Sequence, residues 1–377
     1  MPHVGRHVPV ILLLAIVDIT YQIHKRSSIM FAKCKVLLAI AAFSAAFSAQ
    51  AADITGAGSS AAKPIYTLWS EAYSKAGNPK LNYQPVGSSA GIKQIKEKAV
   101  DFGASDVAMS VEDLRTFKMI CFPSAISGVV PVLNLPGVKQ GELQLTGEIL
   151  ADIFSRKVIK WNDPEIAAVN PGVALPKLPI VAVVRQDGSG TTYNFTDYLS
   201  KVSPSWKSAF GRNFTIAWPA DATQVKGSGG IVGAVKQTAG AIGYVDFNYV
   251  VQEKLNYAKV QNRDGKFVAP TGDSFASALS NSSWKSQATF EEMLTDKPGL
   301  HSWPITMGTF VIIPQTATDP EKTIATLKFF TWAFLKGDKL VTNIDFVRLP
   351  DRVQARIYSE LTKITDSNGN PLHWNME

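Results

Sequence analysis

Short apolar runs alternate with amphipathic stretches along most of the chain. The apolar runs predict strands over residues 81–86, 100–104, 128–135, 180–185, 241–245 and 310–313. The amphipathic stretches predict helices over residues 65–76, 90–98, 147–156, 192–201, 230–237 and 321–336. Alternation of strands with helices is typical of βα units and of a mostly parallel sheet. The sequence therefore predicts an α/β protein.

The first 51 residues do not follow this pattern. From Met30 the chain reads MFAKCK, then VLLAIAAFSAAF, then SAQAAD. A basic segment, an apolar segment and a small-residue cleavage site in this order are typical of a secretory signal peptide. We expect residues 1–51 to be a cleaved leader, with translation beginning at Met30, and the protein to be exported.

Removal of this leader changes the charge of the chain. The whole sequence has 38 basic and 31 acidic residues, and residues 1–51 hold five of the basic and one of the acidic ones. The remainder has 33 basic and 30 acidic residues, a net charge of +3. Because this charge is small and no basic run is present, the composition argues against a nucleic-acid partner.

Three segments share one design. Each takes an extended run through a turn rich in Gly and Ser and then begins a helix: ITGAGSSAAKPIY at 54–66, QPVGSSAGIKQI at 84–95 and VVRQDGSGTTYNF at 183–195. Helix N-termini present free amide hydrogens, and Ser or Thr at the cap adds a hydroxyl. In open α/β sheets such loops lie beyond the carboxyl ends of the strands. Three of them together would surround a small oxyanion.

The few charged residues near these loops indicate which oxyanion. Arg185 and Asp187 are two positions apart, so an extended chain places both on one side and the carboxylate can hold the guanidinium. Asp106 ends the run VDFGASD. A carboxylate only accepts hydrogen bonds, so it repels a fully ionised anion and accepts from one that keeps a proton. Phosphate keeps a proton near neutral pH and sulfate does not, so Asp106 would select phosphate.

Two short motifs suggest other chemistries. Residues 56–61 match the dinucleotide pattern GxGxxA, but no clear strand precedes them and no acidic residue lies about twenty positions further along. Residues 87–91 match GxSxG, the nucleophile turn of α/β hydrolases, with Ser89 as nucleophile. Only His301 and His373 follow the leader as candidate bases. A serine hydrolase using Ser89 stays open as an alternative, as does a receptor for another oxyanion.

The motifs TGAGSS, VGSSAGIKQI, VDFGASD, VVRQDGSGTT and GAIGYVDF, in this order, resemble the periplasmic phosphate-binding proteins of bacterial ABC phosphate transporters, the PstS family. The resemblance extends from Asp53 to the C-terminal DSNGNPL. It implies a type II periplasmic binding protein fold, in which two α/β lobes are joined by a hinge around an interlobe ligand cleft. With the Pro136-Gly137 turn as the exit from the first lobe, we expect lobe I to comprise residues 52–134 and 308–377, and lobe II residues 135–307.

The resemblance also implies a function and a ligand set. The function is high-affinity binding of inorganic phosphate in the periplasm and its delivery to an inner-membrane ABC permease, without enzymatic activity, cofactor or metal, by a monomer. The implied phosphate ligands are Ser60, the Ala61 amide, Ser88, Asp106, Arg185, Ser189, Gly190 and Thr191. Asp187 would support Arg185. One departure is that Ser60-Ala61-Ala62 stands where many family members have Thr-Phe-Pro, which keeps a hydroxyl and an amide but changes the shape of the site wall.

Overall fold

A computed structural model describes residues 53–286, 290–342 and 346–375. The predicted leader, residues 1–51, lies outside the described residues. In the part of the chain that is described, no helix is both long enough and apolar enough to span a bilayer.

The central feature is a nine-stranded sheet in the described residues, with the order β2-β1-β3-β12-β4-β8-β6-β7 and with β9 paired to β4. The strands of the molecule are β1 (Ile54–Gly58), β2 (Leu81–Gln84), β3 (Phe102–Ser105), β4 (Met119–Asn134), β5 (Gln144–Leu145), β6 (Val181–Arg185), β7 (Thr223–Val225), β8 (Ala241–Asp246), β9 (Asn256–Tyr257), β10 (Lys259–Gln261), β11 (Phe267–Val268) and β12 (Thr306–Pro314). The pairs β1–β2, β1–β3, β6–β7 and β6–β8 are parallel. Strands β12 and β4 run antiparallel between the two parallel groups.

Helices follow most of the strands, as the alternating pattern predicted. They are α2 (Lys63–Lys75), α3 (Ser88–Lys96), α4 (Val111–Phe117), α5 (Gly147–Phe154), α6 (Pro164–Ala168), α7 (Gly190–Val202), α8 (Pro204–Ala209), α9 (Gly227–Gln237), α10 (Phe247–Glu253), α11 (Gly272–Ser280), α12 (Pro320–Leu335), α13 (Asp338–Thr342) and α14 (Asp351–Leu361). The predicted α/β class and the six predicted helices are confirmed. Four of those helices, α2, α3, α7 and α9, begin two or three residues earlier than predicted, inside the Gly- and Ser-rich turns.

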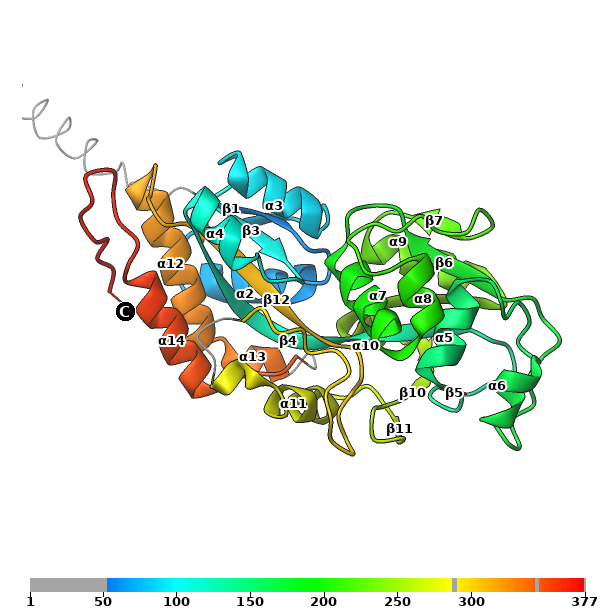
Figure 1. Cartoon of the computed structure of the whole chain (residues 1–377). Coiled ribbons are helices and arrows are strands. Elements are labelled where there is room, and N and C mark those ends of the chain that lie inside the picture. The colour runs from blue at the N-terminus through cyan, green and yellow to red at the C-terminus, as the bar shows by residue number, and fades with distance from the viewer. Residues whose placement is uncertain (1–52, 287–289, 343–345, 376–377) are drawn as a thin grey trace, which may run out of the picture. The chain divides into compact units, whose positions relative to one another are not determined.

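Strand β4 belongs to both parts of the sheet. Its residues from Met119 to Gly128 pair with β12, and those from Val129 to Asn134 pair with β8. Figure 1 shows it running from the half that carries β1, β3 and β12 to the half that carries β6 and β8. We call these the β1 half and the β6 half.

Two sequence-based expectations about strands are corrected. The strand predicted over 128–135 is only the second part of β4, which begins at Met119. The statement that no clear strand precedes the GxGxxA match is wrong, because β1 runs from Ile54 to Gly58 and contains its first glycines. Gly56 fits there because a Cβ atom would lie 2.3 Å from the ring of Phe102 on β3.

Apolar side chains cover both faces of the sheet in the β1 half. On one face, Tyr66 of α2 stacks edge-on against Phe102 of β3 and Phe330 of α12. On the other face, Ile95 of α3 packs with Ile312 of β12. Alternate residues of a strand point to opposite faces, so adjacent strand residues serve both cores. Each fully buried side chain of this size contributes roughly 1.5–3 kcal/mol to stability.

The β6 half is covered in the same way. Phe195 of α7 stacks on Tyr244 of β8, with ring centroids 4.5 Å apart. The next residue back along β8, Gly243, faces Ile231 and Val235 of α9 instead. The helices thus hold the strand ends in fixed positions, which places the loops that follow them.

Candidate functional site

The candidate site is formed by the segments that follow the carboxyl ends of parallel strands. These segments contribute Ser59 and Ser60 after β1, Gly87 and Ser88 after β2, Asp106 after β3, Asp187 to Gly190 after β6, and Gly227 and Ser228 after β7. Arg185 is the last residue of β6. Within each parallel group the strands end at one edge, which is where α/β proteins bind ligands. The two groups run in opposite directions, because three antiparallel pairings separate β3 from β8, and the loops at their two carboxyl ends meet where the Gly190 amide donates to Ser88.

Asp106 is a buried carboxylate that accepts hydrogen bonds from hydroxyl groups. Its Oδ1 accepts from Ser59 at 2.6 Å and from Thr309 at 3.0 Å, and its Oδ2 accepts from Thr191 at 3.3 Å. Burial raises the pKa of Asp106, although these hydroxyls and the charge of Arg185 act in the opposite direction. Because the bond to Oδ2 is long, this oxygen is the better placed of the two to accept a further hydrogen bond.

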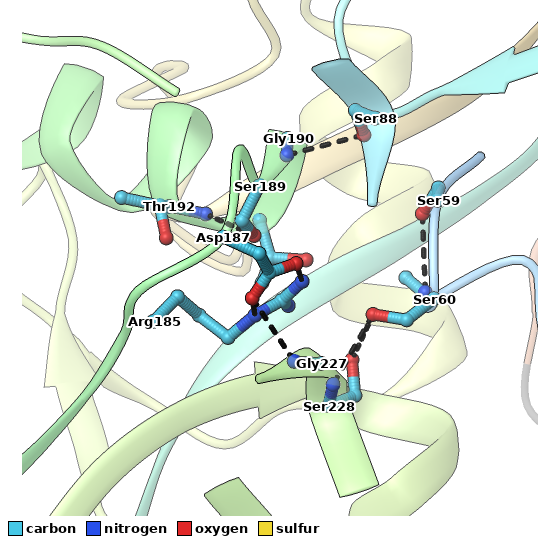
Figure 2. A network of polar contacts seen from close by, with 12 residues as sticks. Ser59, Ser60, Ser88, Arg185, Asp187, Ser189, Gly190, Thr192, Gly227 and Ser228 are labelled. Atoms are coloured by element: carbon cyan, nitrogen blue, oxygen red, sulfur yellow. Dashed lines mark hydrogen bonds and ion pairs between the residues drawn. The ribbon is translucent and has the colours of Figure 1, made fainter. Parts of the chain in front are cut away.

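Ser88 joins the loops of the two halves. Its Oγ accepts from the backbone amide of Asp106 at 3.2 Å. It also accepts from the backbone amide of Gly190 at 3.1 Å (Figure 2). Gly190 has to be a glycine here, because a Cβ atom would lie 2.5 Å from the Ser88 hydroxyl. Asn194 of α7 also stabilises the contact between the two loops, because its side-chain amide donates to the Asp106 carbonyl at 2.7 Å.

The predicted pairing of Arg185 with Asp187 is present. Arg185 Nε donates to Asp187 Oδ1 at 2.7 Å, and Nη2 donates to Oδ2. Arg185 is 2% exposed. Burial acts to raise the pKa of Asp187, but the hydrogen bonds and charge of Arg185 outweigh it and lower that pKa. The pair engages the hydrogen of Nε and one hydrogen of Nη2, so the two hydrogens of Nη1 and the second hydrogen of Nη2 are left as donors for an anion.

Ser60 and Ala61, predicted as ligands, lie in the first loop with different partners. Ser60 Oγ is 2.8 Å from Ser228 Oγ, and both side chains are buried (Figure 2). The Ala61 amide donates to Ser59 Oγ at 3.0 Å. Both residues are therefore next to the Asp106 network, joined to it through Ser59.

Ser189 and Thr191 stand at the start of α7. Ser189 is the N-cap residue, and its Oγ accepts from the Thr192 amide at 3.1 Å. Thr191 reaches Asp106, as described above. The first turn of α7 therefore faces the carboxylate of the other half, and all eight predicted ligands belong to a single set of contacting loops.

Sequence reasoning missed several members of this network. Ser228 could have been found, because GSGG at 227–230 is a fourth Gly- and Ser-rich helix start of the same design. Ser59 precedes the predicted Ser60 directly. Thr309 and Tyr249 carried no local signal, because their roles depend on contacts with residues that are 203 and 189 positions away in the chain.

The site offers neither a metal cluster nor a hydrolase triad. Among residues 53–286, 290–342 and 346–375, no group of three or more His, Cys, Asp or Glu side chains could hold a metal ion. The amide of Ser89 donates to the Gly188 carbonyl, and the described histidines, His301 and His373, are both exposed. No hydrogen bond in the described structure joins Ser89 to either of them.

Comparison with known proteins supplies the family. A family model described as the PBP superfamily domain matches residues 44–336. The chain is 43% identical to the phosphate-binding protein PstS of Pasteurella multocida over 341 residues, which cover 90% of this chain and 99% of the relative. It is also 43% identical to the PstS protein of Haemophilus influenzae, with 83% of this chain and 93% of the relative covered.

A solved structure agrees on the fold. The phosphate-binding protein from Stenotrophomonas maltophilia has a TM-score of 0.63 at 19% identity, with 81% of this chain and 93% of that chain covered. This likeness confirms the two-lobed α/β architecture, and the PstS relatives give no support to the serine hydrolase alternative. The chain belongs to the PstS family of phosphate-binding proteins.

Proposed function

We propose that this protein binds inorganic phosphate in the periplasm with high affinity and delivers it to an inner-membrane ABC permease. Membership of the PstS family supports this function, and family relatives are binding proteins and not enzymes. The single observation that carries the proposal is the convergence of a buried carboxylate, a buried arginine and many neutral donors on one site.

Each of these groups has a part in the proposed recognition. Arg185, through the N–H groups that Asp187 does not use, supplies the positive charge that attracts the anion. The hydroxyls of Ser60, Ser88, Ser189 and Thr191 and the amides of Ala61 and Gly190 donate to phosphate oxygens. Asp106 accepts the hydrogen bond of the protonated phosphate oxygen, through Oδ2. Neutral donors hold the ion without the strong salt dependence of several exposed charges.

Asp106 also gives the proposal its specificity. Sulfate carries no proton to offer, so it would bring a fully ionised oxygen against a buried carboxylate. An unpaired buried charge costs more than the roughly 1–3 kcal/mol of an unpaired neutral group. The alternative of a receptor for sulfate or molybdate is therefore less consistent with the site.

Calorimetric titration of the purified protein with phosphate, arsenate and sulfate tests the function. We expect phosphate to bind tightly, arsenate to bind because it has similar protonation, and sulfate to give no heat of binding. Binding of sulfate as tight as that of phosphate would refute the assigned specificity.

We further propose the lobe boundaries 52–134 plus 308–377 and 135–307, with the hinge in the connecting strands. The change of partner in β4 between Gly128 and Val129 supports a boundary close to this point. We also propose cleavage of the leader after Ala51 and a monomeric state. N-terminal sequencing of the exported protein and light scattering of the purified protein test these two points.

A further inference from the structure

The first turn of α9 obtains its caps from other parts of the chain. Its N-cap residue, Lys226, makes no side-chain cap bond. Instead the Gly227 amide donates to Asp187 Oδ1 at 3.0 Å, and the Ser228 amide donates to Ser60 Oγ at 3.2 Å (Figure 2). Asp187 belongs to the same half as α9, but Ser60 comes from the loop after β1 in the other half.

A third contact from the β6 half reaches the same residue. The hydroxyl of Tyr249, on α10, donates to the Ser60 carbonyl at 2.9 Å. Burial raises the pKa of Tyr249, so this hydroxyl keeps its proton and remains a donor at any physiological pH. Ser60 is thus held by two side chains and one backbone amide from α9 and α10. We call Ser60, Ser228 and Tyr249 the Ser60 clasp.

One of the two possible directions of the Ser60–Ser228 hydroxyl bond leaves a donor for the ligand. A serine hydroxyl has one proton and two acceptor positions. The Ser228 amide occupies one acceptor position of Ser60. The two hydroxyls lie 2.8 Å apart and either one could donate; with Ser228 as the donor, its hydroxyl occupies the other acceptor position. The proton of Ser60 is then the one that remains for the ligand.

We propose that Ser228 and Tyr249 are positioning residues, which aim the Ser60 hydroxyl at phosphate and hold the first loop against α9, and so set how long the ligand stays bound. This inference rests on the proposed function. Asp187 connects the clasp to the ligand, because the same carboxylate orients Arg185 and accepts from the Gly227 amide. When Arg185 binds phosphate, Asp187 moves or stays with it, and Asp187 in turn holds the start of α9, whose Ser228 contacts Ser60.

The experiment compares phosphate dissociation rates of the wild-type protein with those of Ser228→Ala and Tyr249→Phe. Trp218 is a suitable reporter for stopped-flow emission, because its indole donates to the Arg185 carbonyl at 3.1 Å. Loss of a helix cap or of a buried hydrogen bond corresponds to about a tenfold change in an equilibrium. We expect dissociation to be about tenfold faster in each variant, with an association rate that stays within about twofold, because contacts made after encounter act on dissociation.

Two control variants remove similar groups away from the clasp. Ser203→Ala removes a buried hydroxyl that caps α8, and Tyr198→Phe removes a buried hydroxyl that donates to the Gln261 carbonyl at 3.2 Å. Both control residues and their partners lie in residues 135–307. If the clasp residues had only a structural role, the clasp variants would behave like the controls. All four variants would then have lower melting temperatures than the wild-type protein without phosphate, and the same phosphate dissociation rate. The proposal predicts faster dissociation in the clasp variants alone.

A double-mutant test locates the action at Ser60. In a Ser60→Ala background, Ser228→Ala should leave dissociation unchanged, because the hydroxyl that Ser228 positions is already gone. An equal further increase in that background would overturn the positioning role, and so would wild-type rates in both single variants. If the wild-type protein failed to bind phosphate at all, the proposed function would fall instead, so the two failures are distinguishable.

Discussion

Asp106 shows how one buried side chain combines opposing demands. Burial favours its protonated form, whereas the hydroxyls of Ser59, Thr309 and Thr191 and the more distant charge of Arg185 favour its charged form. Three neutral donors around one carboxylate keep it an acceptor without cancelling its charge. Because Asp106 forms no ion pair in the described structure, its charge repels an oxyanion without a proton and accepts a hydrogen bond from one that has a proton.

Replacement of Asp106 by Asn should reduce the preference for phosphate over sulfate. The amide removes the negative charge that repels sulfate and can itself donate a hydrogen bond. We expect the ratio of the two dissociation constants to shrink by roughly tenfold to a hundredfold, which is the effect of one unpaired buried polar group. Calorimetry with both anions measures this ratio, and an unchanged ratio would remove Asp106 from the selective role.

The Arg185–Asp187 pair should respond unequally to substitution. Arg185→Ala removes the cation that we propose as a phosphate ligand and leaves Asp187 as a partly buried charge without its partner, so we expect phosphate affinity to fall by about a hundredfold or more. Asp187→Asn only loosens the guanidinium, and a loss of about tenfold is expected. A larger loss in Asp187→Asn than in Arg185→Ala, measured by the same titrations, would reverse the assigned roles.

The pairing of Arg185 with Asp187 could be read from the sequence because both residues lie on one strand end. The environment of Asp106 could not. Thr309 reaches it from β12, whose position between β3 and β4 depends on the antiparallel pairing of segments far apart in the chain. A single sequence indicates the type of ligand, but it does not show which distant strands pair and so cannot name every residue that lines the site.

At the element scale, helices α3 and α7 contact each other directly through the turns in which they begin. The turn that begins α7 lies against the turn that begins α3, with Gly190 over Ser88 and Gly188 over Ser89. Because no side chain separates these turns, each one holds the other in place. The small residues in the motifs are therefore required by contact between the loops, independently of any ligand.

Two glycine-to-alanine changes test this packing. In Gly190→Ala the new methyl group would meet the Ser88 hydroxyl and the Asp106 Cβ within 2.7 Å, so we expect stability to fall by about 1–3 kcal/mol and phosphate binding to weaken. In Gly233→Ala, inside α9, no atom lies within 4 Å of the new methyl group. Because alanine is the better helix former, this variant should gain about 0.5–1 kcal/mol. Chemical denaturation of both variants gives the comparison, and similar losses would contradict it.

Element boundaries were predicted well where the pattern was strong and poorly where special residues interrupt it. The first part of β4 was missed because Pro123 lacks an amide hydrogen and two serines follow it closely. The structure places Pro123 at an irregularity, where the register with β12 shifts between Thr309 and Phe310. A bulge accommodates a residue that a regular ladder would exclude. Likewise, β1 has glycine at two of its five positions, and its pairing with β2 and β3, not its propensity, makes it a strand.

At the scale of the whole molecule, a second buried carboxyl group marks the junction of the two halves. Asp246 ends β8 opposite Val129, the first residue of β4 that pairs with β8. It is fully buried, and its Oδ2 has no hydrogen-bond partner in the described structure. Burial raises the pKa of Asp246 to about 8, despite the nearby Ser127 hydroxyl and the Asn248 amide.

This raised pKa predicts a pH dependence of stability. An unfolded chain loses the Asp246 proton near pH 3.8, whereas the folded protein keeps it up to about pH 8. The unfolded state therefore binds fewer protons across this interval, so the free energy of unfolding falls as the pH rises through it. Asp246→Asn should reduce that fall by on the order of a few kcal/mol. Urea denaturation at about pH 5 and pH 8 measures it, and the same fall in both proteins would contradict the prediction.

Strand β4 limits how far the protein can be divided. A fragment of residues 135–307 would lack β4, one of the two strands with which β8 pairs. The complementary fragment would carry Val130, Val132 and Leu133 on an uncovered, aggregation-prone edge. The two halves are thus not autonomous modules. A chimera that took one half from a relative would pair β4 of one protein with β8 of the other. Its folding would depend on how well residues 129–134 match that β8.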